Sequence, residues 1–335
     1  MKQKQFLIPF KFKLITAIII FILVFLLSMV MGAAQISVKE VWLAITSNST
    51  GSKLSIIREI RLPREIAAIF VGAALAVSGA IMQGITKNPL ADPGLLGLSA
   101  GANAALAVTM VFIPSSNYFV ILISCFIGSA IGMIMVFGIS SMKKGGFDPF
   151  RVVLAGAAVS AFLYAISEGN SLYFKISKNL SMWTSGGLLG TTWSELEIIV
   201  PFILVGLLIS VLLSRQITVL SLSEEVAVGL GQNTNRIKII LFIVITLLAG
   251  ASVALVGNMA FIGLMIPHIV RAIVGTDYRF IIPLSIFFGA TLMLFADTLG
   301  RVINSPYETP VAAIVSIMGL PFFLFIVRKG GKAFS

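Results

Sequence analysis

Apolar runs of membrane-spanning length recur from one end of this chain to the other, and they limit the folds open to it. Of the 335 residues, 58% are hydrophobic and only 11% are charged, whereas about a quarter of a typical soluble domain is charged. A helix of ~20 apolar residues crosses the hydrocarbon core of a bilayer. Because the runs are continuous rather than alternating, they argue against a transmembrane β-barrel. We therefore predict an all-α polytopic membrane protein.

The runs predict about ten transmembrane helices within a single domain that covers residues 1–335. The eighth run is short and contains Pro267, so we expect it to be tilted, broken or only partly spanning. The first run follows several lysines, as in a signal peptide, but its length favours a retained span over a cleaved one. The expected limits are 14–33, 63–84, 94–113, 117–140, 151–172, 194–214, 237–256, 259–274, 280–300 and 310–328.

The distribution of basic residues predicts the orientation. An even number of spans places both termini on one side, and 16 of the 24 Lys and Arg residues fall on that side. By the positive-inside rule, the side with both termini is the cytoplasmic side, so we expect a multi-pass protein of the bacterial cell membrane. The net charge is +11, but the basic residues that produce it are scattered singly and have no aromatic residues between them. This pattern indicates that they set the membrane topology and contact anionic lipid, rather than bind nucleic acid.

Small residues suggest an internal repeat and close helix packing. Residues 72–79 and 249–257 share a pattern of Gly, Ala and Ser, and each lies in the second span of a set of five. Because five is odd, the halves would be inverted relative to each other. Glycines four positions apart share one helix face, and we interpret such pairs as packing sites. The pairs are Gly97 and Gly101, Gly128 and Gly132, and Gly186 and Gly190.

Sequence motifs typical of enzyme active sites are absent from the chain. No phosphate-binding loop, nucleophile elbow or zinc-protease helix occurs, so we expect no enzyme activity and any ATP hydrolysis to come from another subunit. The lone His268 has no ligand partners at metal spacing, and we expect no metal and no cofactor.

Glu168 and Asp297 lie towards span ends, and no acidic residue sits mid-span. This argues against an ion-coupled carrier, although backbone carbonyls can also bind sodium.

Three arginines lie on the side of the membrane that the predicted orientation assigns to the outside of the cell. Arg61 and Arg64 flank Pro63, which suits the first turn of a helix, and Arg301 closes the ninth span. We expect their guanidinium groups to point into the outer water. They would serve either as interface anchors or, as we favour, as docking points for carboxylates of a partner. Exposed pairs of this kind contribute only ~0–1 kcal/mol each, so they would orient a partner rather than hold it tightly.

The inner loop 215–236 has the signature of a short surface helix. Ser223 is a suitable N-cap, and Glu224 and Glu225 would occupy the first turn, where the helix dipole favours acid. Val226, Ala227 and Leu230 would form an apolar face before Gly231.

Several motifs together resemble one known family. The chain is similar to the ten-span permeases of bacterial ABC importers for iron–siderophore complexes, haem and vitamin B12. The resemblance covers residues 55–328, and the proline-rich and histidine motifs are its most specific parts. Matching segments are Arg61–Arg64, Gly72–Gly79, Met82–Gln83, Asn88–Gly97, Leu154–Gly156, Trp183 with Gly186 and Gly187, Phe261–His268, Ala296–Asp297 with Arg301, and Glu308–Val311.

The resemblance implies partners and a mechanism. Two permeases, either identical or related, would form a dimer around a central path, with two cytoplasmic ATPases below and an extracellular solute-binding lipoprotein above. The family's docking arginines map onto Arg61, Arg64 and Arg301. Its coupling element maps onto Ser221–Gly231, hence onto Ser223, Glu224, Glu225, Ala227, Leu230 and Gly231.

Import of a ferric siderophore by ATP-driven alternating access is the function we expect. Haem or vitamin B12 is an alternative cargo in the same family. An ion-coupled secondary carrier and a membrane scaffold without transport are less favoured alternatives. The resemblance assigns no gate residues in the segment 143–150.

Overall fold

The described part of the chain is entirely helical. The computed structural model describes residues 9–32, 36–47, 49–95, 97–141, 149–185, 187–222, 224–305 and 307–328, and no strand occurs in these ranges. The helices are α1 (Phe10–Val30), α2 (Val38–Thr46), α3 (Ser52–Ile56), a π-helical turn η1 (Ile57–Arg61), α4 (Leu62–Thr86), a 3₁₀ turn η2 (Pro93–Leu95), α5 (Leu98–Phe112), α6 (Tyr118–Ser141), α7 (Pro149–Tyr173), α8 (Ser177–Thr184), α9 (Trp193–Leu212), α10 (Ser214–Leu222), α11 (Glu224–Gly229), α12 (Thr234–Val256), α13 (Ile262–Val274), α14 (Tyr278–Val302) and α15 (Val311–Arg328).

The ten expected spans correspond to eight long apolar helices and two short ones among the described residues. The long ones contain α1, α4, α6, α7, α9, α12, α14 and α15, and the short ones are α5 and α13. With 13 residues, α13 rises only ~20 Å, less than the ~30 Å hydrocarbon core. The eighth span is therefore short, as its sequence indicated. The third span, expected over 94–113, is also shorter than predicted, because Pro93 and the left-handed Gly97 delay the start of α5.

Two helices form the centre of the bundle. Of their apolar windows, α4 has 83% and α12 has 72% of residues buried, the highest shares among the eight long spans. Each is the second long helix of a five-helix half, and each packs against the fourth helix of the other half, α4 against α14 and α12 against α6. The short helices α5 and α13 are both third in their halves. An inverted repeat would produce these correspondences.

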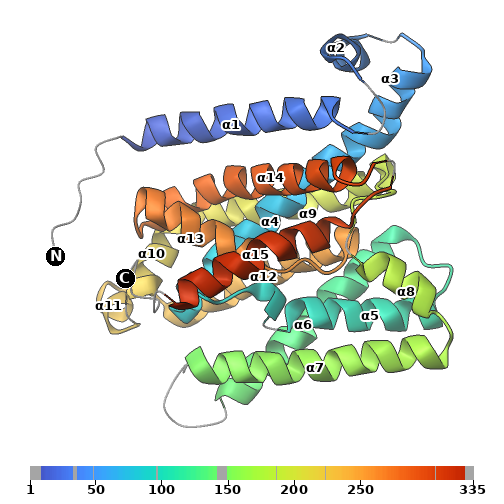
Figure 1. The fold of residues 1–335 in the computed structure, drawn as a ribbon. Helices are drawn as coiled ribbons and strands as arrows, with labels where there is room; N and C mark the ends of the chain where they lie inside the picture. Colours follow the sequence, from blue (N-terminus) through green and yellow to red (C-terminus); the bar gives the residue numbers. More distant parts are fainter. Residues whose placement is uncertain are drawn as a thin grey trace.

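The long helices lie side by side, and shorter helices mark the two ends of the bundle (Figure 1). One end carries α2 and α3, and we call it the α2 end. The opposite end carries α10 and α11, and we call it the α10 end. The first turn of α1 and the last turn of α15 both lie towards the α10 end.

Glycines allow close approach of α5 and α6. A Cβ at Gly101 would lie 2.0 Å from the Gly128 carbonyl oxygen, and one at Gly132 would lie 2.2 Å from that of Gly97. Four of the six expected packing glycines therefore meet at one helix crossing. Gly190 lies between α8 and α9 with a φ of +79°, and not within a helix. Gly186 itself lies outside the described residues.

Candidate functional site

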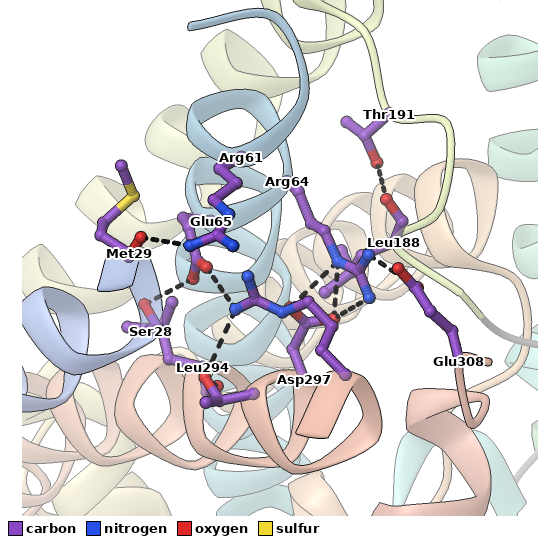
Figure 2. A network of polar contacts seen from close by, with 12 residues as sticks. Ser28, Met29, Arg61, Arg64, Glu65, Leu188, Thr191, Leu294, Asp297 and Glu308 are labelled. Carbon is purple, nitrogen blue, oxygen red and sulfur yellow. Dashed lines mark hydrogen bonds and ion pairs between the residues drawn. The ribbon is translucent and has the colours of Figure 1, made fainter. Parts of the chain in front are cut away.

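Arg64 and Asp297 form the centre of a buried ion network at the α2 end. Arg64 lies in the first turn of α4, and Asp297 lies near the end of α14. The Arg64 Nε and Nη2 atoms donate to Asp297 Oδ1 at 2.9 and 2.8 Å. The third nitrogen, Nη1, donates to Glu308 Oε2 at 2.8 Å. One guanidinium thus links α4, α14 and the segment before α15, as Figure 2 shows.

Arg301 and Arg61 extend the network to α1. The Arg301 Nη2 atom donates to Glu65 Oε1 at 2.5 Å, and its Nε lies 3.1 Å from Asp297 Oδ2. The other Glu65 oxygen accepts from Ser28 Oγ at 2.8 Å. Arg61 Nη1 donates to the backbone carbonyl of Met29 at 2.5 Å. The ends of three long helices are therefore joined by charged side chains (Figure 2).

The expectation that the three arginines point into water is wrong. Arg61, Arg64 and Arg301 are only 5%, 5% and 6% exposed. The reason is that Glu65, Asp297 and Glu308 supply carboxylates within the same cluster, so that three positive and three negative side chains meet. Buried charges persist only when they are paired and hydrogen-bonded. The arginines are thus part of the helix packing at this end.

Sequence reasoning did not identify Glu65 and Glu308 as partners of the arginines. The available signal was local: Glu65 directly follows Arg64 in an apolar helix, and an isolated acidic residue there needs a nearby base. The prediction that the second span begins at Pro63 was also incomplete. Helical structure runs continuously over Ser52–Thr86, with η1 inserted before α4.

A small helical unit precedes the network at the α2 end. Ser37 and Glu40 form a capping box at the start of α2, with Ser37 N donating to Glu40 Oε2 at 2.7 Å. Lys53 from α3 lies 3.0 Å from the other Glu40 oxygen. The Ser37 backbone N–H and Lys53 hold the pKa of the Glu40 carboxyl at about 2, below its ordinary value of 4.5. These contacts fix α2 against α3.

The predicted surface helix is present at the α10 end as α11, and a second helix, α10, precedes it. α10 covers 214–222 and α11 covers 224–229, with Gly231 at a φ of +77° beyond it. Ser223 lies outside the described residues, and Glu224 opens α11. Ala227 is buried, whereas Glu225 and the apolar Val226 and Leu230 are exposed. The unit therefore presents apolar side chains away from the bundle.

Hydrogen bonds connect this unit to the long helix α14. Thr218 in α10 donates through Oγ1 to Asp277 Oδ1 at 3.2 Å and accepts from Tyr278 N at 2.9 Å. Asp277 is the N-cap of α14. Its contact with Arg279 holds the pKa of the Asp277 carboxyl below its ordinary value. A displacement of α10 would thus be transmitted to α14, whose other end carries Asp297 and Arg301.

No group of three or more metal-ligating side chains occurs in the described residues. His268 in α13 is 7% exposed and packs edge-on against Phe322, with ring centroids 5.8 Å apart. Its surroundings include Lys87 and Arg271, which line the same cavity. A nearby cation, Arg271, and the ring contact with Phe322 suit a structural histidine better than a metal ligand.

The chain matches the sequence model of the FecCD transport family over residues 20–329. It is 42% identical to the iron(3+)-hydroxamate import system permease protein FhuB of Bacillus subtilis over 304 residues, covering 90% of this chain and 79% of that protein. It is 40% identical to the iron-uptake system permease protein FeuB of the same organism, covering 95% and 96%. It is also 37% identical to the hemin transport system permease protein HmuU of Yersinia pestis, covering 89% and 90%.

A solved structure shares the fold. It is described as an inward-facing conformation of a metal-chelate type ABC transporter, and it superposes with a TM-score of 0.81 at 24% identity. The similarity covers 96% of this chain and 100% of that one.

Proposed function

This chain belongs to the FecCD transport family, and we propose that it is the membrane permease of a binding-protein-dependent ABC importer that carries a ferric siderophore into the cytoplasm. The family match over residues 20–329 is the observation that carries this proposal. The similarity to an iron(3+)-hydroxamate permease favours a siderophore as cargo. Haem is the second candidate, because a hemin permease is 37% identical.

In this proposal the α10 end faces the cytoplasm of the cell, and the α2 end faces outward. The bias of Lys and Arg residues towards the termini and the α10 end supports this orientation. ATP hydrolysis would take place in two separate cytoplasmic subunits. The permease would pair with itself or with a related permease, so that two bundles enclose the path of the chelate.

The unit formed by α10 and α11 would contact the ATPase. Its exposed Val226 and Leu230, beside the exposed Glu225, offer an apolar surface with an acidic edge. Ser223, Glu224, Ala227 and Gly231 complete the proposed coupling element. Through Thr218 and Asp277, motion of this unit would reach α14 and change the packing around the path.

Arg61, Arg64 and Arg301 would contribute to docking of the solute-binding protein in a modified way. Their donors already face Glu65, Asp297 and Glu308, so they attract an incoming carboxylate less than exposed arginines would. Glu308 is the accessible partner, with its side chain 31% exposed. A carboxylate of the binding protein would reach Arg64 by displacing Glu308, which would tie docking to the position of α15.

Deletion of the gene tests the proposal. Uptake of labelled ferric hydroxamates, ferric citrate, haem and cobalamin is measured in parallel in the deletion strain and in a complemented strain. Loss of ferric siderophore uptake alone supports the proposal. Loss of haem or cobalamin uptake alone would replace the cargo but keep the family function. Uptake that collapses with the proton gradient and ignores ATP depletion would favour a secondary carrier.

A further inference from the structure

The short helix α2 lies at the level where the first span leaves the membrane. The α1 helix has 21 residues and therefore rises ~31 Å, about the thickness of the hydrocarbon core. Val41 and Ala44 of α2 are buried in one cluster with Met29, which belongs to the last turn of α1. The depth of α2 is thus that of the end of α1, where acyl chains meet lipid head groups.

The surroundings of α2 are those of a lipid-facing segment. Figure 1 shows α2 beside the end of α1 and away from the other long helices. Only 17% of the apolar window of α1 is buried, the lowest share among the eight long spans. Leu23 and Leu27, in the second half of α1, are exposed on its surface. Lipid therefore borders α1 up to the turn on which α2 packs.

Three large apolar side chains form an exposed stripe on α2. Val38, Trp42 and Ile45 occupy positions i, i+4 and i+7 and so share one helix face. They are 68%, 67% and 55% exposed, although Val41 and Ala44 on the adjacent face are buried. The apolar surface of α2 thus extends beyond what the protein covers. A contiguous exposed apolar patch of this kind marks an interaction site for a protein or a membrane.

The chemistry of the stripe suits a lipid surface. Tryptophan is enriched at membrane–water interfaces, because its ring is apolar and its indole N–H is polar. Lys39 and Thr46 are exposed and border the stripe, so they offer polar groups to lipid head groups. A helix with a tryptophan on its apolar face and charge beside it lies in the plane of the interface.

Contacts within the protein fix the direction in which the stripe points. Arg58 of η1 donates through Nε to the Ala44 carbonyl at 2.8 Å and through Nη2 to the Ser47 carbonyl. These carbonyls lie at the C-terminal end of α2, where a helix leaves carbonyls without partners. The Arg58 carbonyl accepts from Trp193 Nε1 at 2.9 Å, which connects α9 to the same unit. The stripe is therefore already in place to meet the membrane.

We propose that α2 is an interfacial helix that inserts Val38, Trp42 and Ile45 into the phospholipid leaflet at the α2 end. Arg58 lies in η1 together with Arg61, so insertion of α2 also anchors the turn from which the ion network starts. The inference concerns contact with lipid and does not depend on which cargo is carried.

Depth-dependent fluorescence quenching tests this insertion. The full-length permease is reconstituted into liposomes whose phosphatidylcholine carries bromine either near the top of the acyl chains or near their ends. Iodide, present on both sides of the membrane, reports exposure to water. The emission of Trp42 is obtained as the difference between the unchanged chain and Trp42→Phe. Trp193 is retained in both, because it contacts Arg58.

Shallow bromine is expected to quench the Trp42 emission by about half, and deep bromine much less, since an interfacial helix lies ~5–10 Å into the boundary between head groups and acyl chains. Iodide should quench it weakly. In Ile45→Ser the quenching by shallow bromine should fall about twofold, because a large apolar side chain next to Trp42 is lost. Ile60→Ser is the matched control, because it is the same change at an exposed side chain of η1, and it should leave the quenching unchanged.

Strong quenching of Trp42 by iodide and none by bromine would overturn the proposal, because the stripe would then face water. Protection from iodide without quenching by bromine would also overturn it, because another protein surface would then cover Trp42. If this protection appears only when the solute-binding protein is added, the stripe belongs to that partner instead. Equal quenching in Ile45→Ser and in the unchanged chain would contradict insertion of the stripe.

Discussion

Arg64 and Asp297, 233 positions apart in the sequence, form a forked ion pair whose side chains are 6% and 0% exposed. The pair ties the start of α4, the most buried of the long helices, to the end of α14. Removing one member of a buried pair leaves an uncompensated charge, which costs ~3–5 kcal/mol.

Arg64→Ala is therefore expected to destabilise the purified permease by at most ~3–5 kcal/mol, because Arg301 still faces Asp297. The thermal unfolding midpoint in detergent should fall strongly, and the double variant Arg64→Leu with Asp297→Leu should recover much of the loss. Lys178→Ala, at an exposed lysine, serves as the control. An unfolding midpoint within error of wild type for Arg64→Ala would show that the pair does not stabilise the fold.

The same pair shows where sequence reasoning succeeded and where it stopped. The apolar runs predicted the eight long helices and the two shorter ones. Positive charge on the expected outer side singled out Arg61, Arg64 and Arg301. Their partners could not be found by spacing, because Arg301 and Glu65 are 236 positions apart. Such contacts depend on how α4 and α14 pack, and periodicity carries no information about packing when helices are apolar on all sides.

Glycine packing gives a second prediction. Gly101→Ala would place a Cβ 2.0 Å from the Gly128 carbonyl oxygen, so α5 and α6 must separate. Overpacking of this kind costs ~1–3 kcal/mol, and the unfolding midpoint should fall. Gly138→Ala in the partner helix α6 is the control, since a Cβ there would meet no atom within 4 Å. Equal midpoints for the two variants would contradict the close crossing.

The connection between α10 and α14 predicts a coupling defect. Thr218→Val removes the hydroxyl that bonds Asp277 and Tyr278 while keeping the shape of the side chain. ATP-driven uptake should fall several-fold while basal ATP hydrolysis by the assembled importer stays near wild type. Thr291→Val is the matched control, because the Thr291 hydroxyl donates to the Phe287 carbonyl of its own helix α14, and this variant should retain uptake. A parallel loss of uptake and hydrolysis in Thr218→Val would indicate failed assembly rather than failed coupling.

The capping box of α2 predicts a pH-dependent local transition. Because the pKa of Glu40 falls from 4.5 to about 2 on folding, its contribution to stability is complete above pH 4.5 and is lost as pH falls towards 2. Trp42 in α2 reports this change once Trp183 and Trp193 are replaced by Phe. The Trp42 fluorescence should change over this window in the wild-type background and lose this step in Glu40→Gln. A step of equal size in both would assign the transition to another group.

Transport by the reconstituted importer decides whether this chain is the permease of an ATP-driven importer. The permease is assembled with its ATPase in liposomes, the binding protein is added on the side of the α2 end, and entry of a labelled ferric trihydroxamate is measured. Entry should require both ATP on the α10 side and the binding protein. Entry that proceeds without ATP and follows an imposed proton or sodium gradient would contradict it.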